Sequence, residues 1–464
     1  MTPLELGQLI LQQLPYEPNS QQIQLVAALA RFCLSDSSAD PVFLLNGYAG
    51  TGKTSLTGAL VRALESTGRK AVLLAPTGRA AKVFAAHSRH PAYTIHRQIY
   101  RMNVAGVSHV ADNPHRDAVF IVDEASMIGS GSDGGENLLQ DLIHYVYTGT
   151  GCRLLLLGDM AQLPPVGCAE SPAMEVETLK SYGLRVSRAV LTDTVRQAST
   201  SGILYNATWI RRAMRAEPLP APRLSVSAFD DVKVIEGEEL EDEMGRCYSA
   251  DGIRETVLIT RSNKRATAFN QAIRTAILGR EGVIGRDELL MVAKNNYHWS
   301  AKVAGLDFIA NGDVATVSRV YGKERRYGFE FADVSLHFPY RDIEIDAKLL
   351  LDTMWSETAS LGAAELAELA QACLADPEFA PASDSATAMR AALKSCPYYN
   401  ALQVKYAYAV TCHKAQGGQW ANVFVDMGYI PPEAQGMEFY RWLYTATTRA
   451  TTTLYYVNPT VEVR

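Results

Sequence analysis

The sequence predicts an α/β protein with two sheets of parallel strands that follow one another along the chain. Two observations predict this class: short, nearly continuous apolar runs recur in two series, and helical stretches separate the runs within each series. Parallel strands have this apolar character because helices bury both faces of their sheet. At 464 residues the chain is also long enough for about three domains.

The first series lies in the N-terminal part of the chain and the second in the C-terminal part. The runs of the first series are residues 41–46, 70–76, 118–124 and 153–159, and those of the second are residues 255–261, 402–411, 422–428 and 452–458. Each run has the length of a buried strand, so we expect two α/β units in tandem.

From residue 311 to about residue 400 the pattern changes to an alternation of apolar and polar residues. Three stretches alternate with a period of two: residues 312–320, 329–338 and 341–347. This alternation is typical of a small antiparallel barrel. An Ala- and Leu-rich helical stretch follows, from about residue 346 to residue 395. We interpret the whole segment as an insertion into the second unit, and the shorter irregular segment 87–116 as an interruption of the first.

Composition and charge indicate a globular protein that stays away from membranes. The first thirty residues contain no Lys or Arg, and no apolar run approaches the roughly 18 residues that a membrane span needs. The seven cysteines are widely spaced without a C-x-x-C pair, so neither a disulfide framework nor a zinc ribbon is expected. We therefore expect a reducing, cytoplasmic compartment and no membrane partner.

The formal net charge of −6 argues against a nucleic-acid partner only if the charge is evenly spread. It is not, because the acidic run 236–244 supplies six of the acids. Basic clusters recur elsewhere, at residues 62–82, 211–215, 261–280 and 323–326. Most such clusters are solvated surface, so they permit a nucleic-acid partner without predicting one.

The segment GYAGTGKT, which begins at Gly47, fits the phosphate-binding pattern G-x-x-x-x-G-K-[ST] at every fixed position and follows a predicted strand. Together with Gly47, Gly50 and Gly52 allow backbone N–H groups to turn inward onto a β-phosphate. We expect Lys53 to reach the β- and γ-phosphates and the Thr54 hydroxyl to bind Mg²⁺. The loop therefore predicts a nucleoside triphosphate and Mg²⁺ as cofactors, with Lys53 also acting in catalysis.

Two further predicted strands end in polar residues that suit phosphate chemistry. FIVDEASMI closes a strand with Asp123, expected to hold Mg²⁺ directly or through water, and Glu124, expected to polarise the attacking water. LLLLGDMAQLPPV ends the next strand with Gly158, Asp159 and Gln162. The neutral amide of Gln162 is expected to hydrogen-bond the γ-phosphate or the water.

These motifs, in this order, resemble those of superfamily 1B DNA helicases, in particular the RecD/Dda-like branch, over about residues 19–449. The resemblance implies ATP as the nucleotide and two tandem RecA-like domains. It divides the chain into a first RecA-like domain at 1–185 with a small pin insertion at 87–116, a second at 186–310 and 401–464, and an SH3-like 2B domain with a helical extension at 311–400.

The resemblance also implies roles for residues around the nucleotide. Gln22 aligns with the adenine-recognising glutamine, although Asn19 stands where Thr is common and Gln21 remains an alternative register. Arg196 in LTDTVRQ and Arg449 in LYTATTRA align with the two arginines that reach the γ-phosphate. Val195 replaces a tyrosine that stacks on adenine in many relatives. Further nucleotide contacts are expected from Thr51, Ser55, Gln416 and Gly417.

Contacts with single-stranded DNA are implied on both lobes. LAPTGRAAKVF and TIHRQIY resemble motifs Ia and Ib, and AVTCHKAQGGQW resembles motif V. Hydroxyl, imidazole and lysine groups suit phosphate, so the expected contacts are Thr77, Thr94, His96, Thr411, His413 and Lys414. Five aromatic rings could stack on bases, but packing is the expected role of each: Tyr93, Tyr100, Tyr321, Tyr327 and Trp355.

The sequence thus predicts an ATP- and Mg²⁺-dependent DNA helicase that acts on single-stranded and tailed duplex DNA, as a monomer, in a bacterial or phage-type cytoplasm. The 5′-to-3′ polarity follows only from the resemblance. A 3′-to-5′ or RNA-directed helicase stays open, and so does a P-loop switch that hydrolyses ATP without translocating. The arginine and the basic, hydroxyl-rich motif in the second lobe argue against the switch.

Overall fold

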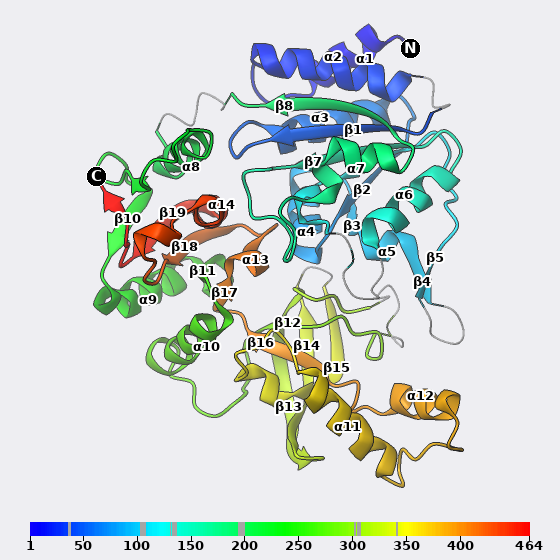
Figure 1. The fold of residues 1–464 in the computed structure, drawn as a ribbon, viewed down its shortest axis with the longest axis vertical. Helices are drawn as coiled ribbons and strands as arrows, with labels where there is room; N and C mark the ends of the chain where they lie inside the picture. The colour runs from blue at the N-terminus through cyan, green and yellow to red at the C-terminus, as the bar shows by residue number, and fades with distance from the viewer. Residues whose placement is uncertain are drawn as a thin grey trace.

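The computed structural model describes residues 1–464 except 36–38, 103–107, 130, 132–136, 194–199, 301–302, 304–307 and 340–341. Two α/β units lie side by side and a barrel with two helices lies below them (Figure 1). Both sheets consist of parallel strands, which confirms the predicted α/β class with two tandem units. Within the described part of the chain, no helix combines the length and the apolarity that a bilayer span requires.

The first unit is a sheet of six parallel strands in the order β3-β2-β6-β7-β1-β8. Its strands are β1 (Pro41–Gly47), β2 (Ala71–Ala75), β3 (Ala92–Thr94), β6 (Val119–Val122), β7 (Arg153–Gly158) and β8 (Arg185–Leu191). Every residue of β1, β2, β6 and β7 is buried, which explains the continuous apolar runs.

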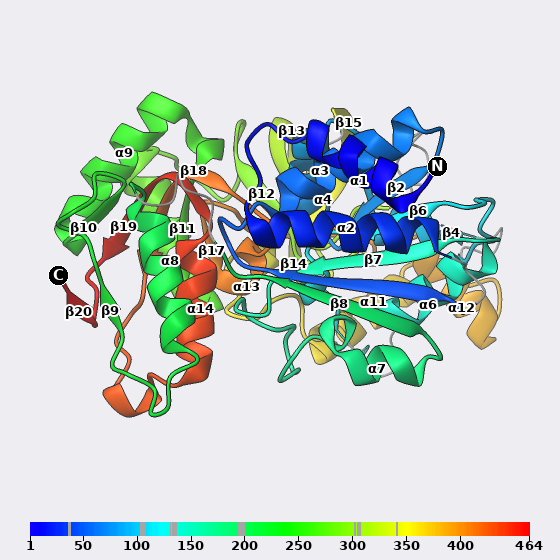
Figure 2. The ribbon, with the colours of Figure 1, turned by 90° about the horizontal axis from the view of Figure 1, so that it is seen from above.

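Helices cover both faces of this sheet. One face packs against α1 (Pro3–Gln12), α2 (Ser20–Leu34), α3 (Lys53–Ser66) and α4 (Gly78–Ser88), and the other against α5 (Ile95–Ile99), α6 (Leu138–Thr148) and α7 (Val176–Ser181). Figure 2 shows α2 lying along the strands from above. The C-terminal ends of β1, β6 and β7 therefore open at one edge of a rigid layer, as ligand sites of parallel sheets do.

Strand β8 extends the first unit beyond its predicted end. It pairs with β1 over the whole of β8, so the unit continues to Leu191 instead of ending at residue 185. The sequence did not reveal this strand because β8 is an edge strand with several exposed side chains, which breaks the apolar run.

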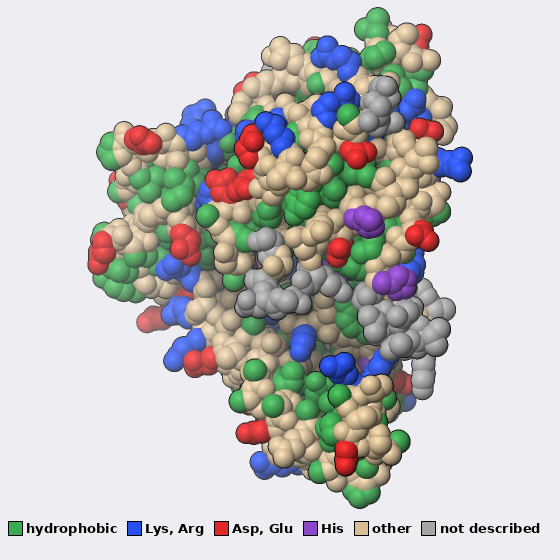
Figure 3. Space-filling view, turned by 45° about the vertical axis from the view of Figure 1, so that its right-hand side comes forward, with side chains coloured by type: hydrophobic (Ala, Val, Ile, Leu, Met, Phe, Trp, Pro, Cys, Tyr) green, Lys and Arg blue, Asp and Glu red, His purple; other side chains and the backbone are tan. Residues whose placement is uncertain are grey.

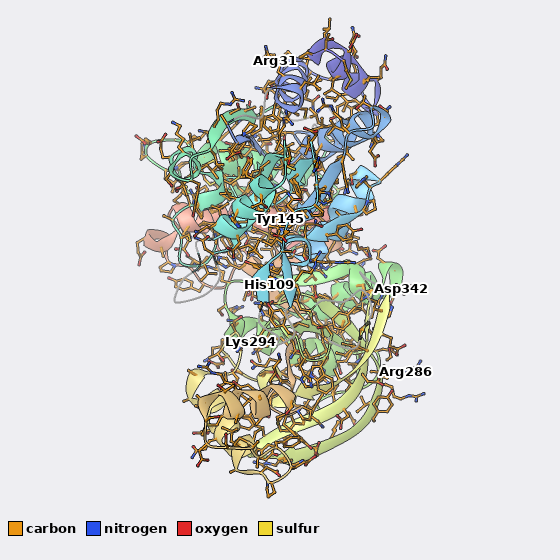
Figure 4. All side chains as sticks on the ribbon, turned by 90° about the vertical axis from the view of Figure 1, so that its right-hand side faces the viewer. Arg31, His109, Tyr145, Arg286, Lys294 and Asp342 are labelled. Atoms are coloured by element: carbon orange, nitrogen blue, oxygen red, sulfur yellow. The ribbon has the colours of Figure 1, made fainter. Side chains whose placement is uncertain are left out.

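The segment predicted as a pin contains a two-stranded antiparallel ribbon of β4 (Tyr100–Met102) and β5 (Ser108–Val110). The ribbon is smaller than the predicted insertion at 87–116, because β3 and α5 in that range belong to the main sheet and its covering helices. The Tyr100 hydroxyl donates to the Asp141 carboxylate at 2.6 Å and anchors the ribbon to α6. Figure 4 shows His109 of β5 and Lys294 facing the junction between the first unit and the barrel.

The second unit is a sheet of five parallel strands in the order β10-β19-β18-β11-β17. Its strands are β10 (Val232–Ile235), β11 (Thr256–Thr260), β17 (Ala409–Thr411), β18 (Trp420–Asp426) and β19 (Ala450–Val457). Its main helices are α8 (Gly202–Ala213), α9 (Leu240–Asp251), α10 (Asn263–Ala272) and α14 (Met437–Thr447). Helices α8 and α14 pack side by side on the flank that faces the first unit (Figure 2).

The insertion is a closed five-stranded barrel with two helices between its fourth and fifth strands. Its strands are β12 (Leu289–Val292), β13 (Val314–Arg326), β14 (Phe329–Phe338), β15 (Ile343–Leu350) and β16 (Leu402–Tyr406), and the helices are α11 (Ala363–Ala375) and α12 (Ala386–Ser395). The barrel therefore takes β12 and β16 from outside the predicted range 311–400. The run predicted as one strand at 402–411 divides between the barrel and the second sheet. Its SH3-like character stays a prediction.

A buried charge network joins the barrel to the second unit. The Glu288 carboxylate accepts hydrogen bonds from Arg274, Arg280 and the Tyr408 hydroxyl, each at 2.9 Å. Burial alone would raise the pKa of Glu288, but these donors hold it below its usual value. Removing one partner of such a network leaves an uncompensated buried charge, so the network fixes the barrel on the second sheet.

Candidate nucleotide site and nucleic-acid interface

The glycine-rich loop connects β1 to α3 and has the conformation that its sequence predicts. Gly52 precedes α3 with a φ of +80°, in the left-handed region that favours glycine. A Cβ at Gly52 would lie 2.6 Å from the Tyr16 hydroxyl and 2.7 Å from Gln22 Nε2. Both the backbone conformation and the available space therefore require glycine here.

Lys53 lies between the ends of two neighbouring strands. Its Nζ donates to the carbonyl of Gly47, at the end of β1, and to the carbonyl of Gly158, at the end of β7, at 3.3 Å. These carbonyls hold the ammonium group at the edge of the sheet, beside the loop. A triphosphate at the loop would offer Lys53 charged acceptors in place of these neutral ones.

Two carboxylates, the half-buried Asp123 and the buried Asp159, share this edge with Lys53. Burial raises the pKa of Asp123 to about 6, Glu124 adds to the shift, and Lys53 opposes it. Burial likewise raises the pKa of Asp159, again opposed by Lys53. The charges of Lys53 and Glu124 therefore act on both Asp123 and Asp159. Carboxylate oxygens are the ligands that a divalent cation prefers, a bound cation would favour their ionised form, and the Thr54 position in the first turn of α3 suits the same ion.

The Gln162 side chain lies buried beside these acids. Gln162 is 6% exposed, and its Oε1 atom has no hydrogen-bond partner among the described residues. A buried amide oxygen without a partner is costly unless a ligand or water satisfies it. This is the position at which the sequence predicted an amide near the γ-phosphate or the attacking water.

The two glutamines of α2 contact different parts of the molecule. Gln22 Nε2 donates to the Thr51 carbonyl in the loop at 3.0 Å. In a capping box, Gln22 Oε1 accepts from the Asn19 N–H and the Gln22 N–H donates to Asn19 Oδ1. Gln21 instead binds Thr192, beyond β8. Its Nε2 donates to the Thr192 hydroxyl at 2.8 Å, and its Oε1 accepts from the Thr192 N–H at 3.0 Å. Of the two registers, only the one with Gln22 brings a glutamine to the loop. Ser55 lies next to Tyr16 on the same side.

The second unit closes directly onto the loop through α14. The Tyr444 hydroxyl donates to Asp159 at 2.7 Å and accepts from the Ala49 N–H at 2.9 Å. The backbone of Leu163 is held from the same side, since its N–H donates to Thr445 at 2.9 Å and its carbonyl accepts from Gln416 at 2.6 Å. Gln416, expected at the nucleotide, thus binds the segment after β7.

Two arginines of the second unit stack on the loop residue Tyr48. The Arg211 guanidinium lies 4.3 Å from the ring centroid of Tyr48, and that of Arg215 lies 5.3 Å away. Burial lowers the pKa of Arg211, and nearby Tyr444 and Asp159 oppose this shift. Sequence reasoning identified 211–215 only as a basic cluster, and it overlooked Tyr444 although the residue lies inside LYTATTRA. No sequence pattern around residues 211–215 or around Tyr444 predicts a contact with another domain.

The structure describes only one of the two predicted arginine fingers. Arg449 is buried within the second unit, where its guanidinium bonds the carbonyls of Thr445 at 3.0 Å and Gly418 at 3.3 Å and the hydroxyl of Thr448 at 3.0 Å. It therefore does not lie on the phosphate loop in this structure. Arg196 and its neighbour Val195 lie outside the described residues.

The expected DNA contacts of the first unit lie at helix starts. The Thr77 and Thr94 hydroxyls accept the N–H groups of Ala80 and Arg97, each at 3.2 Å, and so cap α4 and α5. His96 lies between the rings of Tyr100 and Phe308, at 5.5 and 5.6 Å, and burial lowers its pKa. Phe308 belongs to the connection between the barrel strands β12 and β13, so His96 lies at the junction of the first unit and the barrel.

The motif V segment faces these residues from the second unit. Thr411 ends β17, and His413 and Lys414 follow in α13 (Cys412–Ala415), where burial lowers the pKa of both. Gly417 packs on α4, since a Cβ there would lie 2.9 Å from Ala80 and 3.4 Å from the Thr77 hydroxyl. The structure thus brings the Thr77 and motif V segments together, and it places Gly417 on α4 instead of on the nucleotide loop.

Basic side chains border this junction in a space-filling view (Figure 3). Across it, the Arg79 guanidinium of α4 lies 4.1 Å from the centroid of the Trp420 ring. Of the five aromatic residues, Tyr100 and Tyr327 pack and hydrogen-bond internally, and Tyr93 stacks with Arg97 at 4.7 Å. The other two rings are more exposed, Tyr321 at 54% and Trp355 at 42%.

Comparison with known proteins finds two similar family models and several similar relatives. Residues 18–219 match the model of an AAA domain, and residues 406–457 match that of a UvrD-like helicase C-terminal domain. The ATP-dependent RecD2 DNA helicase of Deinococcus radiodurans is 27% identical over 413 residues, 88% of this chain and 45% of that protein. The ATP-dependent DNA helicase Dda of Enterobacteria phage T4 is 33% identical over 136 residues, 28% of this chain and 29% of that protein.

The aligned regions thus span less than half the length of either relative. Among solved structures, a Bacteroides Pif1 helicase in complex with ADP-AlF3 and ssDNA has a TM-score of 0.49 and 15% identity, over 96% of this chain and 92% of that chain. The phosphate loop and the sequence matches make the chain similar to superfamily 1 helicases. Both curated relatives support a similarity to the superfamily 1B helicases of the RecD/Dda type.

Replacing Asp123 with Asn should stabilise the protein at pH 7.5. The Asp123 carboxylate is half-buried and its pKa is raised to about 6, so its ionised form destabilises the fold at pH 7.5. The advantage of Asn should be smaller at pH 5, where the folded carboxylate is neutral, and should vanish only below the ordinary pKa of 3.8, where the unfolded chain is protonated as well. Thermal unfolding at pH 7.5 and pH 5 measures this, with the exposed Asp112→Asn as control. A variant that melts below the wild type at pH 7.5 would contradict the assignment.

Replacing Tyr444 with Phe should weaken the contact between the two units. The change removes the bond to the Asp159 carboxylate and the acceptor for the Ala49 N–H, at an expected cost of about 1–3 kcal/mol. Calorimetry should show a lower thermal midpoint. Tyr429→Phe, at a side chain that is 82% exposed, is the matched control. Equal midpoints for Tyr444→Phe and the control would show that this hydroxyl does not hold the units together.

Proposed function

We propose that the protein is an ATP- and Mg²⁺-dependent DNA helicase that translocates 5′ to 3′ on single-stranded DNA and separates duplexes. One observation carries the proposal: the second unit contacts the phosphate loop, since Tyr444 bonds both Ala49 and Asp159. A nucleotide at the loop must therefore change the contact between the units. In a P-loop switch without translocation, no second unit of this kind is needed.

The residues around the loop fit MgATP. Lys53 would hold the β- and γ-phosphates, Thr54 and Asp123 would hold Mg²⁺, and Gln22 would recognise adenine next to the loop. Bound Mg²⁺ would neutralise charge that develops on the phosphates. Glu124 would orient the attacking water, and Gln162 offers its unsatisfied amide oxygen on the same side. The raised pKa of Asp123 supports this assignment, because a cation would relieve the cost of ionising it.

Hydrolysis would depend on the closure of the two units. Arginine fingers supply about 10³ to 10⁵ in rate when they reach the transferring phosphate. In the proposed cycle, Arg449 leaves its contacts with Thr445, Thr448 and Gly418 and turns toward the phosphates when ATP is bound. Arg196 would act in the same way from the segment LTDTVRQ. A site completed by the second unit makes turnover sensitive to anything that moves that unit.

DNA would move the second unit because its expected contacts lie on both sides of the junction. Thr77, Thr94 and His96 lie on the first unit, and Thr411, His413 and Lys414 lie on the second. A Cβ at Gly417 would lie 3.4 Å from the Thr77 hydroxyl, so these two segments lie close together without DNA. A strand held by both units would be drawn along as the junction opens and closes. Two curated relatives are named ATP-dependent DNA helicases, which supports DNA as the substrate.

The ribbon of β4 and β5 is proposed as the pin that separates strands, and the protein is proposed to act as a monomer in a reducing cytoplasm. The ribbon lies at the junction through which a strand would pass (Figure 4). All seven cysteines are free thiols, which fits a reducing compartment.

Unwinding of a duplex with either a 5′ or a 3′ single-stranded tail tests the proposal. ATP should drive unwinding of the 5′-tailed duplex only. Lys53→Ala should abolish ATP turnover, because the cation that holds the phosphates is gone, and should leave single-strand binding largely intact, because the expected DNA contacts lie elsewhere. Fluorescence release of a labelled strand and phosphate release measure the two activities.

Other outcomes would select between the rivals. Unwinding of the 3′-tailed duplex alone would establish a motor of the opposite polarity. Unwinding of tailed RNA but not DNA would favour an RNA-directed helicase. ATP turnover without unwinding of any tailed duplex would favour the switch, and loss of both turnover and single-strand binding in Lys53→Ala would show that the site is misassigned.

A further inference from the structure

A small hollow lies where the barrel joins the second unit, between α10 and the strands β16 and β17. Its polar lining includes Lys405 on β16, Thr411 at the end of β17 and Lys414 on α13. Lys405 therefore comes from the barrel, and the other two come from the second sheet and its helix. The hollow is separate from the phosphate loop, which belongs to the first unit.

Two lysine side chains share this hollow without a carboxylate among its described lining residues. Burial lowers the pKa of Lys405 to about 8, and the charge of Lys414 adds to the shift. Burial also lowers the pKa of Lys414. The Lys405 ammonium donates to the carbonyl of Ser356, a neutral partner, and the adjacent Glu357 pairs with Lys264 on the surface at 3.4 Å.

Such an arrangement costs free energy unless an anion completes it. A half-buried ammonium loses hydration, and a second ammonium nearby adds repulsion. One phosphate group with several acceptor oxygens would satisfy both lysines and the Thr411 hydroxyl at once. The donors of the hollow therefore suit one phosphate group.

An exposed aromatic ring lies next to this hollow. Trp355 directly precedes Ser356, which binds Lys405, and its side chain is 42% exposed. The indole packs in a T-shaped arrangement against the ring of Tyr406, which also lines the hollow. The two ring centroids are 6.1 Å apart and the ring planes meet at 80°. An exposed indole beside a phosphate site is the combination that holds a nucleotide of a single strand without regard to sequence.

We propose that this hollow binds one backbone phosphate of single-stranded DNA between Lys405 and Lys414, and that Trp355 stacks on a neighbouring base. This inference rests on the proposed helicase function. It extends the expected DNA-binding surface from the second unit onto the barrel. Lys405 and Trp355 are contacts that the motifs do not indicate. Since Lys405 belongs to the barrel, a strand bound here contacts the barrel and the second unit at the same time.

The salt dependence of DNA binding tests the phosphate site. Each phosphate neutralised on a single strand contributes about 0.7 to the slope of log affinity against log salt concentration. Lys405→Met should reduce that slope by about 0.7, and Lys405→Arg should keep it. The exposed Lys323→Met, on β13 of the same barrel, is the matched control and should also keep the slope. Fluorescence anisotropy of a labelled oligothymidylate, titrated at several salt concentrations, provides the measurement.

Stability separates a binding role from a structural one. Removing a half-buried charge should raise the thermal midpoint of Lys405→Met while its DNA affinity falls. A lower thermal midpoint of Lys405→Met together with lower DNA affinity would indicate that Lys405 only supports the fold. An unchanged salt slope would show that Lys405 does not bind a DNA phosphate. Either result would overturn the phosphate site. A wild type that binds no single-stranded DNA would instead overturn the proposed function itself.

Trp355→Ala tests the stacking half of the proposal. Loss of one stacked base should weaken oligothymidylate binding by about 5- to 150-fold without changing the salt slope, because no charge is removed. Trp355→Phe, which keeps an aromatic face, should retain most of the affinity. Equal affinities of wild type and Trp355→Ala would overturn the stacking, and a changed slope would show that the substitution disturbs the phosphate site instead.

Discussion

The hydroxyl of Tyr444 is the contact on which the arrangement of the two units depends. It donates to Asp159 and accepts from Ala49, so one atom of the second unit satisfies a buried carboxylate and a loop N–H of the first. Burial raises the pKa of this tyrosine, which keeps its proton in place for the bond to Asp159. Tyr48 and Leu163 of the first unit also join the hydrophobic core of the second. The phosphate loop is therefore part of the contact between the units.

A buried ion network links the barrel to the second unit. Glu288 with its two arginines forms a buried ion network at the point where β12 begins. The helical extension is fixed to the barrel in turn by Arg326, which bonds Asp376 at 2.6 Å and Glu378 at 2.8 Å. A movement of the second unit against the first therefore carries the barrel and its extension along. DNA held at the barrel would experience the same movement.

The sequence predicted the parts of the fold in which local chemistry decides the structure. Central strands such as β1 and β7 are buried on both faces and so appear as apolar runs, whereas the edge strands β8 and β10 carry exposed residues and do not. The barrel strand β16 resembles a sheet strand in sequence. Only the tertiary pairing with β12 shows that it belongs to the barrel.

The same limit applies to the site. Fixed motif positions such as Lys53 and Asp123 could be predicted because phosphate chemistry requires particular residue types at particular spacings. The roles of Tyr444 and Arg211 depend on which helix face meets the other unit, and no local pattern encodes that. Gln22 and Gln21 differ by one position on a helix, about 100° apart, so only the structure shows that Gln22 faces the loop.

The most direct test of the account is the rate of ATP turnover by the wild-type protein with and without single-stranded DNA. If the nucleotide site is completed by a unit that DNA moves, saturating oligothymidylate should raise turnover strongly, because closure supplies the arginines that hydrolysis needs. Equal turnover with and without DNA would contradict the account, since it would show that the nucleotide site works without any coupling between the two units.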